Sequence, residues 1–131
     1  MIQVVQFGCP VCRPETAEAA WEATRKLEPR HKLVDESHYT LRVRGCPACG
    51  QPFLSVFTEL VDWEGGDDSQ GWVVIPITPE EEADLLAGKY FQKDHLIYEI
   101  GEDRPSVWRI CPRGAECYIR WGTGIPFLPY N

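Results

Sequence analysis

The sequence predicts an α+β fold of mostly antiparallel strands and hairpins, with one N-terminal helix and one short helix. Three observations support this prediction. The chain of 131 residues has the length of a single domain, spanning residues 1–131. Apolar residues recur at helical spacing in one segment near the N-terminus. From residue 38 onward, short β-branched and aromatic segments alternate with turns rich in glycine, proline and aspartate.

The N-terminal part is predicted to form a strand followed by a helix. Residues 2–7 are mainly apolar and β-branched, which favours a strand. A helix is expected over residues 14–27, because Pro14 suits a first helical turn and Pro29 ends the helix. One stripe of this helix consists of Ala17, Ala20, Trp21, Thr24 and Leu27.

The middle of the sequence is predicted to form a strand and then a hairpin. Residues 38–43 alternate well enough for a strand, and residues 53–63 are rich in aromatic and β-branched side chains. The turn at residues 64–68 contains two glycines that can adopt positive φ. Residues 72–77 then form the returning strand of the hairpin.

The second half is predicted to contain a short helix, a strand and a second hairpin. Thr78 can cap the helix, Pro79 occupies its first turn, Glu81 completes a capping box, and Gly88 ends it. Residues 95–100 are expected to form a strand. Residues 107–111 and 117–121 flank a Pro-Arg-Gly turn and are expected to form the hairpin.

Charge is unevenly distributed along the chain. The net charge is −7; residues 1–50 carry seven Lys and Arg against six Asp and Glu, and residues 51–131 carry six against fourteen. Such acidity disfavours binding of a phosphate backbone. A local basic face is still available from Arg25, Lys26, Arg30, Lys32, Arg42 and Arg44, although a solvated helix face and strand edge is the favoured interpretation of these residues.

No membrane segment or signal peptide is indicated by the sequence. No apolar run approaches the roughly 18 residues of a membrane helix. The N-terminus lacks the basic start and long apolar core of a secretory signal. We therefore predict a cytoplasmic location, where free thiols stay reduced.

Two cysteine pairs share one local sequence. GCPVC spans residues 8–12 and GCPACG spans residues 45–50. In a reducing compartment, two C-x-x-C pairs predict a tetrahedral Zn²⁺ site, because this spacing lets both sulfurs of a pair reach one ion at about 2.3 Å. Backbone N–H groups of such a turn can point at the thiolates, and Gly50 permits the left-handed backbone that completes it. The predicted ligands are Cys9, Cys12, Cys46 and Cys49.

GCPVC and GCPACG resemble the two knuckles of a zinc ribbon, a family of small β units held together by a metal ion. The resemblance covers the knuckles and the adjoining strands, and it implies that the same four cysteines bind the metal. Two features depart from the family pattern. Arg13-Pro14 follows the first knuckle in place of glycine, and 33 residues, including a helix, separate Cys12 from Cys46.

A thiol–disulfide oxidoreductase is the main alternative. A strand, a C-x-x-C pair and a helix in that order also resemble the first unit of a thioredoxin or glutaredoxin. Cys9 would then be the nucleophile, with its pKa lowered by the helix N-terminus, and Cys12 the resolving thiol. That fold needs a further parallel strand and helices on both faces of the sheet. It also leaves the second cysteine pair without a role, so zinc is the favoured prediction.

The remaining cysteines, the histidines and the large aromatic residues are expected to have structural roles. Cys111 and Cys117 could pair as a disulfide or join a second metal site, but two buried free thiols are favoured in a reducing compartment. His31, His38 and His95 lack metal-ligand spacing and are expected to be ordinary polar or partly buried residues. Trp63, Trp72, Trp108, Tyr118 and Trp121 are expected in the core, with an aromatic interaction surface as the alternative.

The functional prediction is a non-catalytic zinc-binding protein in a protein–protein interaction or adaptor role. A closed four-thiolate site leaves no open position for activating water. The acidic second half would suit a basic partner protein. A nucleic-acid-binding zinc ribbon that uses the basic stretch from Arg25 to Arg44 is a further alternative, disfavoured by the net charge.

Overall fold

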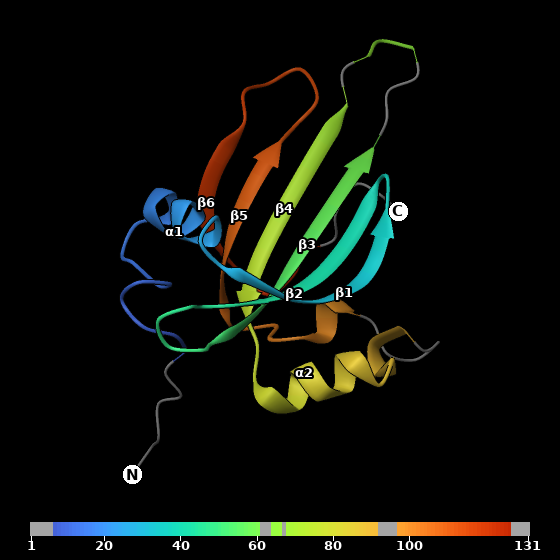
Figure 1. Ribbon diagram of the computed structural model, residues 1–131. Coiled ribbons are helices and arrows are strands. Elements are labelled where there is room, and N and C mark those ends of the chain that lie inside the picture. The colour runs from blue at the N-terminus through green and yellow to red at the C-terminus, as the bar shows by residue number, and fades with distance from the viewer. Residues whose placement is uncertain (1–6, 61–63, 67, 92–96, 127–131) are drawn as a thin grey trace.

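A computed structural model describes residues 7–60, 64–66, 68–91 and 97–126. It contains a six-stranded antiparallel sheet in which the strands lie in chain order (Figure 1). The strands are β1 Glu28–Glu36, β2 Tyr39–Gly45, β3 Pro52–Leu60, β4 Ser69–Pro76, β5 Pro105–Cys111 and β6 Tyr118–Thr123. The helices are α1 Ala17–Thr24 and α2 Pro79–Leu86, with 3₁₀-helices η1 Lys89–Phe91 and η2 Ile97–Glu99. The predicted α+β class is confirmed.

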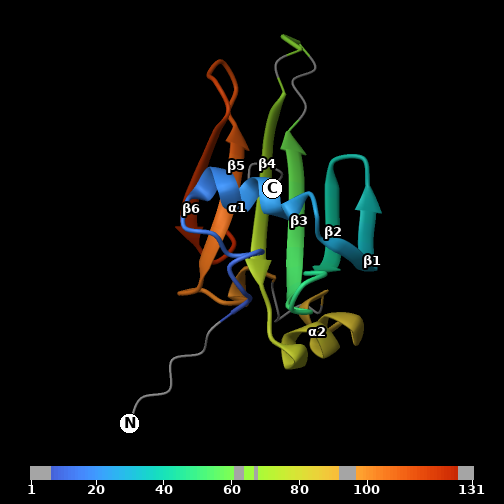
Figure 2. The same ribbon diagram turned by 60° about the vertical axis from the view of Figure 1, so that its left-hand side comes forward.

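The two faces of the sheet bury different clusters. One face packs against α2, η2 and Ile125, and it contains the largest fully buried side chains of β2, β3 and β4. The other face carries α1 and the first cysteine pair, which pack against Phe53, Val74 and Val107. Figure 2 shows α1 lying across this second face, and both views place α2 at one end of the sheet. Neither α1 nor α2, with eight residues each, is long enough to cross a membrane.

The predicted hairpins and capping box are confirmed. β3 pairs with β4, and β5 pairs with β6, both antiparallel. The Thr78 hydroxyl accepts the Glu81 amide at 3.0 Å, and the Glu81 carboxylate accepts the Thr78 amide at 2.8 Å. Glu81 also pairs with Arg104 at 2.7 Å, and Arg104 donates to the Pro76 carbonyl, so the first turn of α2 is fixed to the end of β4.

Strand β1 was not predicted, because its sequence does not look like a strand. The segment EPRHKLVDE is mostly charged and mostly exposed. Among the described strands β2 alone pairs with it, so it is an edge strand: one side of its backbone needs no partner, and charged side chains are favoured there. Its apolar contribution is limited to Leu33 and Val34, which pack at the margin of the core. The predicted helix is also shorter than expected, ending at Thr24.

The predicted strand over residues 95–100 is wrong where the structure describes it. Ile97–Glu99 forms a 3₁₀-helix, and both Ile97 and Ile100 are buried in the same core. Residues three apart share a face in a helical turn, whereas in a strand they would point to opposite faces. The expected strand at residues 2–7 lies outside the described residues except for Phe7, which has no regular structure.

The interpretation of Cys111 and Cys117 as two free buried thiols is wrong. The two residues form a disulfide, and Cys117 is exposed. The hairpin register explains the bond. Ile110 lies opposite Tyr118, so the next pair toward the turn is Cys111 and Cys117, with Cα atoms 4.0 Å apart.

Candidate metal centre

The four cysteines predicted as ligands lie together. Their sulfurs are all within 4.8 Å of one another, although 33 residues separate Cys12 from Cys46. In Figure 1 the blue turn that contains Cys9 and Cys12 lies beside the green connection between β2 and β3, which contains Cys46 and Cys49. This is the convergence that a shared ion requires, and the cluster could hold a metal.

The distances between sulfurs match a tetrahedral site. A zinc ion bound by four thiolates at about 2.3 Å separates neighbouring sulfurs by about 3.8 Å. The Sγ atoms of Cys9 and Cys12 are 3.9 Å apart, those of Cys9 and Cys46 4.0 Å, and those of Cys12 and Cys49 3.8 Å. These distances are too long for disulfides, which require about 2.05 Å.

The first turn holds its two sulfurs through backbone hydrogen bonds. The carbonyl oxygen of Cys9 accepts the amides of Cys12 at 3.1 Å and of Arg13 at 2.8 Å. The amide of Cys9 points back at the Cys12 sulfur, 3.2 Å away. Gly8 precedes the turn with φ +78°, and a Cβ atom there would lie 2.6 Å from the Cys12 sulfur. Only glycine therefore fits at this position.

The second turn is built in a similar way at the β2–β3 connection. The Cys46 carbonyl oxygen accepts the Gly50 amide at 2.8 Å, and the Cys46 amide donates to the Gln51 carbonyl oxygen at 3.0 Å. The Ala48 amide points at the Cys46 sulfur at 3.4 Å. Gly50 has φ +79°, which confirms the predicted left-handed conformation. Both turns thus direct amide hydrogens at sulfur, which favours a cluster of negative thiolates.

Burial and hydrogen bonding act differently on the two thiols of the first turn. Hydrogen bonds from the backbone amide of Cys12, and then of Val11, lower the pKa of Cys9 to about 7. Burial raises the pKa of Cys12 to about 12. The thiolate form of Cys12 therefore needs a compensating positive charge, and a bound cation supplies one by displacing the proton.

Gln51 is a supporting residue that the sequence did not reveal. Its side-chain oxygen accepts the Gly8 amide at 3.0 Å, and its side-chain nitrogen donates to the carbonyl oxygens of Pro52 and Ile77, both at 2.8 Å. One amide group thus connects the first cysteine turn to the start of β3 and the end of β4. Its position directly after GCPACG was the only available signal, and that signal does not specify a role.

Arg13 explains one departure from the zinc-ribbon pattern. It stands where the second turn has Gly50, and its amide completes the turn by donating to Cys9. Its guanidinium donates to the Pro105 carbonyl oxygen at 3.2 Å and lies 5.0 Å from the ring centre of Trp121. Burial lowers the pKa of Arg13, and the neighbouring Cys12 opposes that shift. A cation therefore lies beside Cys12, one of the two buried cysteines of the cluster.

The other candidate residues lie elsewhere. Within the described part of the chain no histidine belongs to the cluster. His31 lies 3.4 Å from Glu82 and His38 lies 2.8 Å from Glu59, and both are partly buried as expected. His95 lies outside the described residues. Cys111 and Cys117 are occupied by their disulfide and do not form a second metal site.

The thioredoxin-like arrangement is not found in the described residues. Helix α1 begins at Ala17 and is capped by Thr16, so its N-terminus does not lie at Cys9. The amides that lower the pKa of Cys9 belong to the turn itself. Each pair of neighbouring strands from β1 to β6 is antiparallel, whereas the oxidoreductase fold needs a parallel pair.

Two glycine substitutions should separate backbone strain from steric conflict at the cluster. In Gly50→Ala the added Cβ meets nothing within 4 Å, so only the positive φ is penalised, by about 1–2 kcal/mol. In Gly8→Ala the Cβ also meets the Cys12 sulfur and the Arg13 side chain. We expect a much larger loss of zinc affinity for Gly8→Ala, measured by competition with a chromophoric chelator. Equal losses in the two variants would contradict the steric explanation.

Replacing Gln51 should weaken metal binding without removing a ligand. Gln51→Ala breaks three hydrogen bonds that fix Gly8 relative to β3 and β4, and loss of such supporting contacts typically costs about 10- to 100-fold in affinity. Gln70→Ala is the matched control, because Gln70 bonds to Glu59 away from the cluster. Chelator competition should show a loss for Gln51→Ala alone; unchanged affinity would argue against this supporting role.

Comparison with known proteins does not identify a family for this chain. The chain matches no protein-family model, and no curated protein or solved structure is significantly similar to it.

Proposed function

We propose that Cys9, Cys12, Cys46 and Cys49 bind one structural Zn²⁺ ion, and that the protein is a non-catalytic binding or adaptor protein. The observation that supports the metal site most strongly is that three pairs of sulfurs are 3.8–4.0 Å apart and all four sulfurs lie within 4.8 Å of one another. Sulfur-only ligands favour zinc or iron among common metals, and four thiolates at tetrahedral corners are typical of structural zinc.

The ion would attach the N-terminal segment to the sheet. Two ligands precede α1, and two lie between β2 and β3. Within the described residues the first cysteine turn is otherwise fixed by the bond from Gly8 to Gln51, by the contacts of Arg13 with β5 and β6, and by packing of Cys12 against the α1 cluster. Zinc binding would therefore contribute directly to folding of this region. With all four positions filled by protein, the ion has no site for a substrate or a reactive water.

Metal content and cysteine variants test this proposal. We expect one zinc per chain by elemental analysis of protein purified without chelators. Cys46→Ser should lose the metal and lower the melting temperature, because it removes a buried ligand. The double variant Cys111→Ser/Cys117→Ser is the matched control, since it changes two sulfurs outside the cluster and should retain the metal. A metal-free native protein with full stability would overturn the proposal.

Thiol–disulfide exchange remains a second candidate because of two features of the first pair. The pKa of Cys9 is lowered to about 7, and its sulfur lies 3.9 Å from that of Cys12. The same samples distinguish this candidate. If Cys9→Ser retains full stability but abolishes reductase activity toward an insulin disulfide, the protein is an oxidoreductase. If Cys9→Ser loses zinc and stability together, the site is structural.

An acidic surface supports a basic protein as the partner. Glu99, Glu102 and Asp103 are exposed around the turn that follows η2, beside Phe7. Opposite charge across an interface mainly accelerates association and selects partners. The partner we propose therefore presents Lys and Arg to this turn.

Charge reversal tests the partner assignment. The variant Glu102→Lys/Asp103→Lys should lose proteins that the tagged wild type retains at low salt, and those proteins should be basic. Glu18→Lys/Glu22→Lys on α1 introduces the same change in charge at another exposed site and should retain them. Partners lost equally from both variants, or retained by both, would contradict the assignment of the binding surface to this turn.

A further inference from the structure

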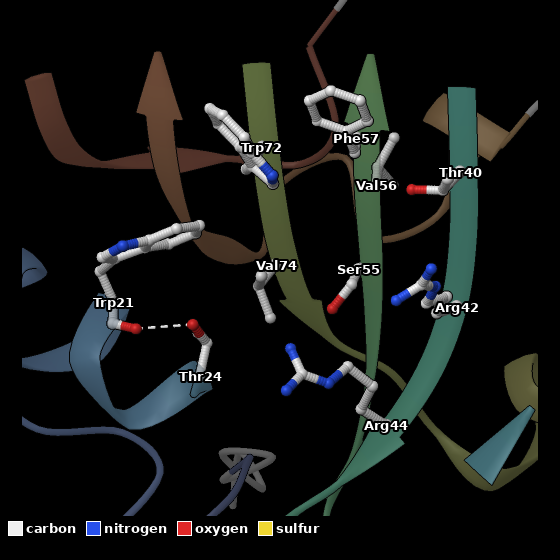
Figure 3. A pocket seen from close by; sticks show the side chains of 10 residues that line it. All are labelled: Trp21, Thr24, Thr40, Arg42, Arg44, Ser55, Val56, Phe57, Trp72 and Val74. Carbon is white, nitrogen blue, oxygen red and sulfur yellow. Dashed lines mark hydrogen bonds between the residues drawn. The ribbon is translucent and has the colours of Figure 1, made fainter. Parts of the chain in front are cut away.

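A groove of about 340 Å³ opens beside α1, on the sheet face that this helix only partly covers (Figure 3). Its volume is within the range of small-molecule sites. The lining comes from α1 and strands β2, β3 and β4, and comprises Trp21, Thr24, Thr40, Arg42, Arg44, Ser55, Val56, Phe57, Trp72 and Val74. None of the four cysteines lines the groove, so it is separate from the metal centre.

Strand register explains why polar and aromatic side chains meet there. Arg42 pairs with Ser55, and Ser55 pairs with Val74, so the three lie in one row across the sheet. The next row contains Thr40, Phe57 and Trp72 in the same order of strands. Directly opposed residues point to the same face of a sheet. The groove therefore has a cationic side on β2 and an aromatic side on β3 and β4.

The two arginines on the cationic side of the groove are only weakly neutralised by protein carboxylates. Within the described part of the chain Arg44 forms no ion pair, and its guanidinium donates to the Leu27 carbonyl oxygen at 3.1 Å. Arg42 contacts the exposed Asp35 at 3.7 Å. Among the described residues that line the groove none carries a carboxylate, and Figure 3 shows the Arg42 guanidinium beside Ser55 and the Arg44 side chain reaching toward Thr24 and Val74. Burial, and then the neighbouring Arg42, lower the pKa of Arg44, as expected for a cation without a counter-charge.

Ser55, in the same row of the sheet as Arg42 and Val74, has a hydroxyl group without a hydrogen-bond partner among the described residues. Its Oγ atom is buried. A buried hydroxyl without a partner is unfavourable, and an acceptor placed between Ser55 and the two arginines would satisfy it. Arg42, Arg44 and Ser55 thus line one end of the groove and together offer donors that suit an oxyanion.

The aromatic side favours a compact ligand over a stacked nucleic acid strand. Phe57 and Trp72 have ring centres 4.9 Å apart, and Arg109 lies 4.8 Å from the centre of the Trp72 ring. Trp21 meets Trp72 edge-on at 6.2 Å. Phe57, Trp21 and Arg109 therefore occupy part of the surface of the partly buried Trp72 ring. What remains open suits one compact apolar group better than the extended stacking platform that single-stranded nucleic acids use. The net charge of −7 also repels a polyanion.

We propose that this groove binds a small organic anion. Its phosphate or carboxylate group contacts Arg42, Arg44 and Ser55, and its aromatic or apolar part packs against Phe57, Trp72 and Trp21. The charge of the groove selects the anion, and the aromatic side chains supply apolar contact that inorganic phosphate cannot use.

Simple probes test both halves of the site in the chain of residues 1–131. Phenyl phosphate and benzoate carry the two candidate anions; phenol supplies the ring alone and inorganic phosphate the anion alone. Binding is followed by tryptophan fluorescence and by the NMR signal of the Trp72 indole N–H. We expect at least one aromatic anion to bind about tenfold or more tightly than both phenol and inorganic phosphate, because it uses both sides of the groove.

Variants locate the binding. Arg42→Gln/Arg44→Gln should weaken binding of the aromatic anion by about tenfold or more, since it removes both charge-assisted contacts. Arg120→Gln is the matched control, because Arg120 stacks on Trp108 on the opposite face of the sheet. An unchanged far-UV circular dichroism spectrum and melting temperature would show that each variant is folded. Phe57→Leu should weaken binding without changing charge.

Three results would overturn the proposal. The first is no binding of phenyl phosphate or benzoate at concentrations on the order of 10 mM. The second is equal binding by Arg42→Gln/Arg44→Gln and the wild type. The third is salt-sensitive binding of an eight-nucleotide oligouridylate about tenfold tighter than either probe, which would assign the surface to nucleic acid.

Discussion

The convergence of four sulfurs is the constraint on which the N-terminal half of the structure depends. The pair at Cys46 and Cys49 lies in the connection between β2 and β3, so the sheet itself positions it. The pair at Cys9 and Cys12 precedes α1 and approaches from a different part of the chain. Gln51 bonds to Gly8 and to two strand ends, and so holds the two turns in register. A bound ion would convert this proximity into a strong link between the helix and the sheet.

The sheet serves two purposes on its two faces. One face is closed by α2, η2 and Ile125, and its fully buried aliphatic side chains form the main core. The other face is covered by α1 over β5 and β6, whereas the part toward β2 remains open as the groove. The proposed metal would stabilise α1 on this face, and α1 contributes Trp21 and Thr24 to the groove wall. The two proposed sites therefore share no residues, but α1 links them.

The sequence predicted those elements whose signals are local. The capping box at Thr78 and Glu81 and both hairpins were read correctly, because caps, turns and β-branched segments act over a few residues. Strand β1 was missed because an edge strand can be charged on nearly every position. Ile97 and Ile100 were assigned to a strand because two apolar residues three apart do not distinguish a strand from a helical turn. In the structure both side chains are buried in the same core, which requires the 3₁₀-helical conformation.

The sequence by itself determined the composition of the cysteine cluster, since two identical Gly-Cys-Pro-x-Cys stretches imply a common geometry. It also determined the acidic character of the second half. The tertiary structure alone decided that Cys111 faces Cys117, that Gln51 joins the two cysteine turns, and that Arg42, Arg44 and Ser55 share a groove with Trp72. The physical reason is that strand register and long-range packing place these side chains together, and neither is encoded in the spacing of residues along the chain.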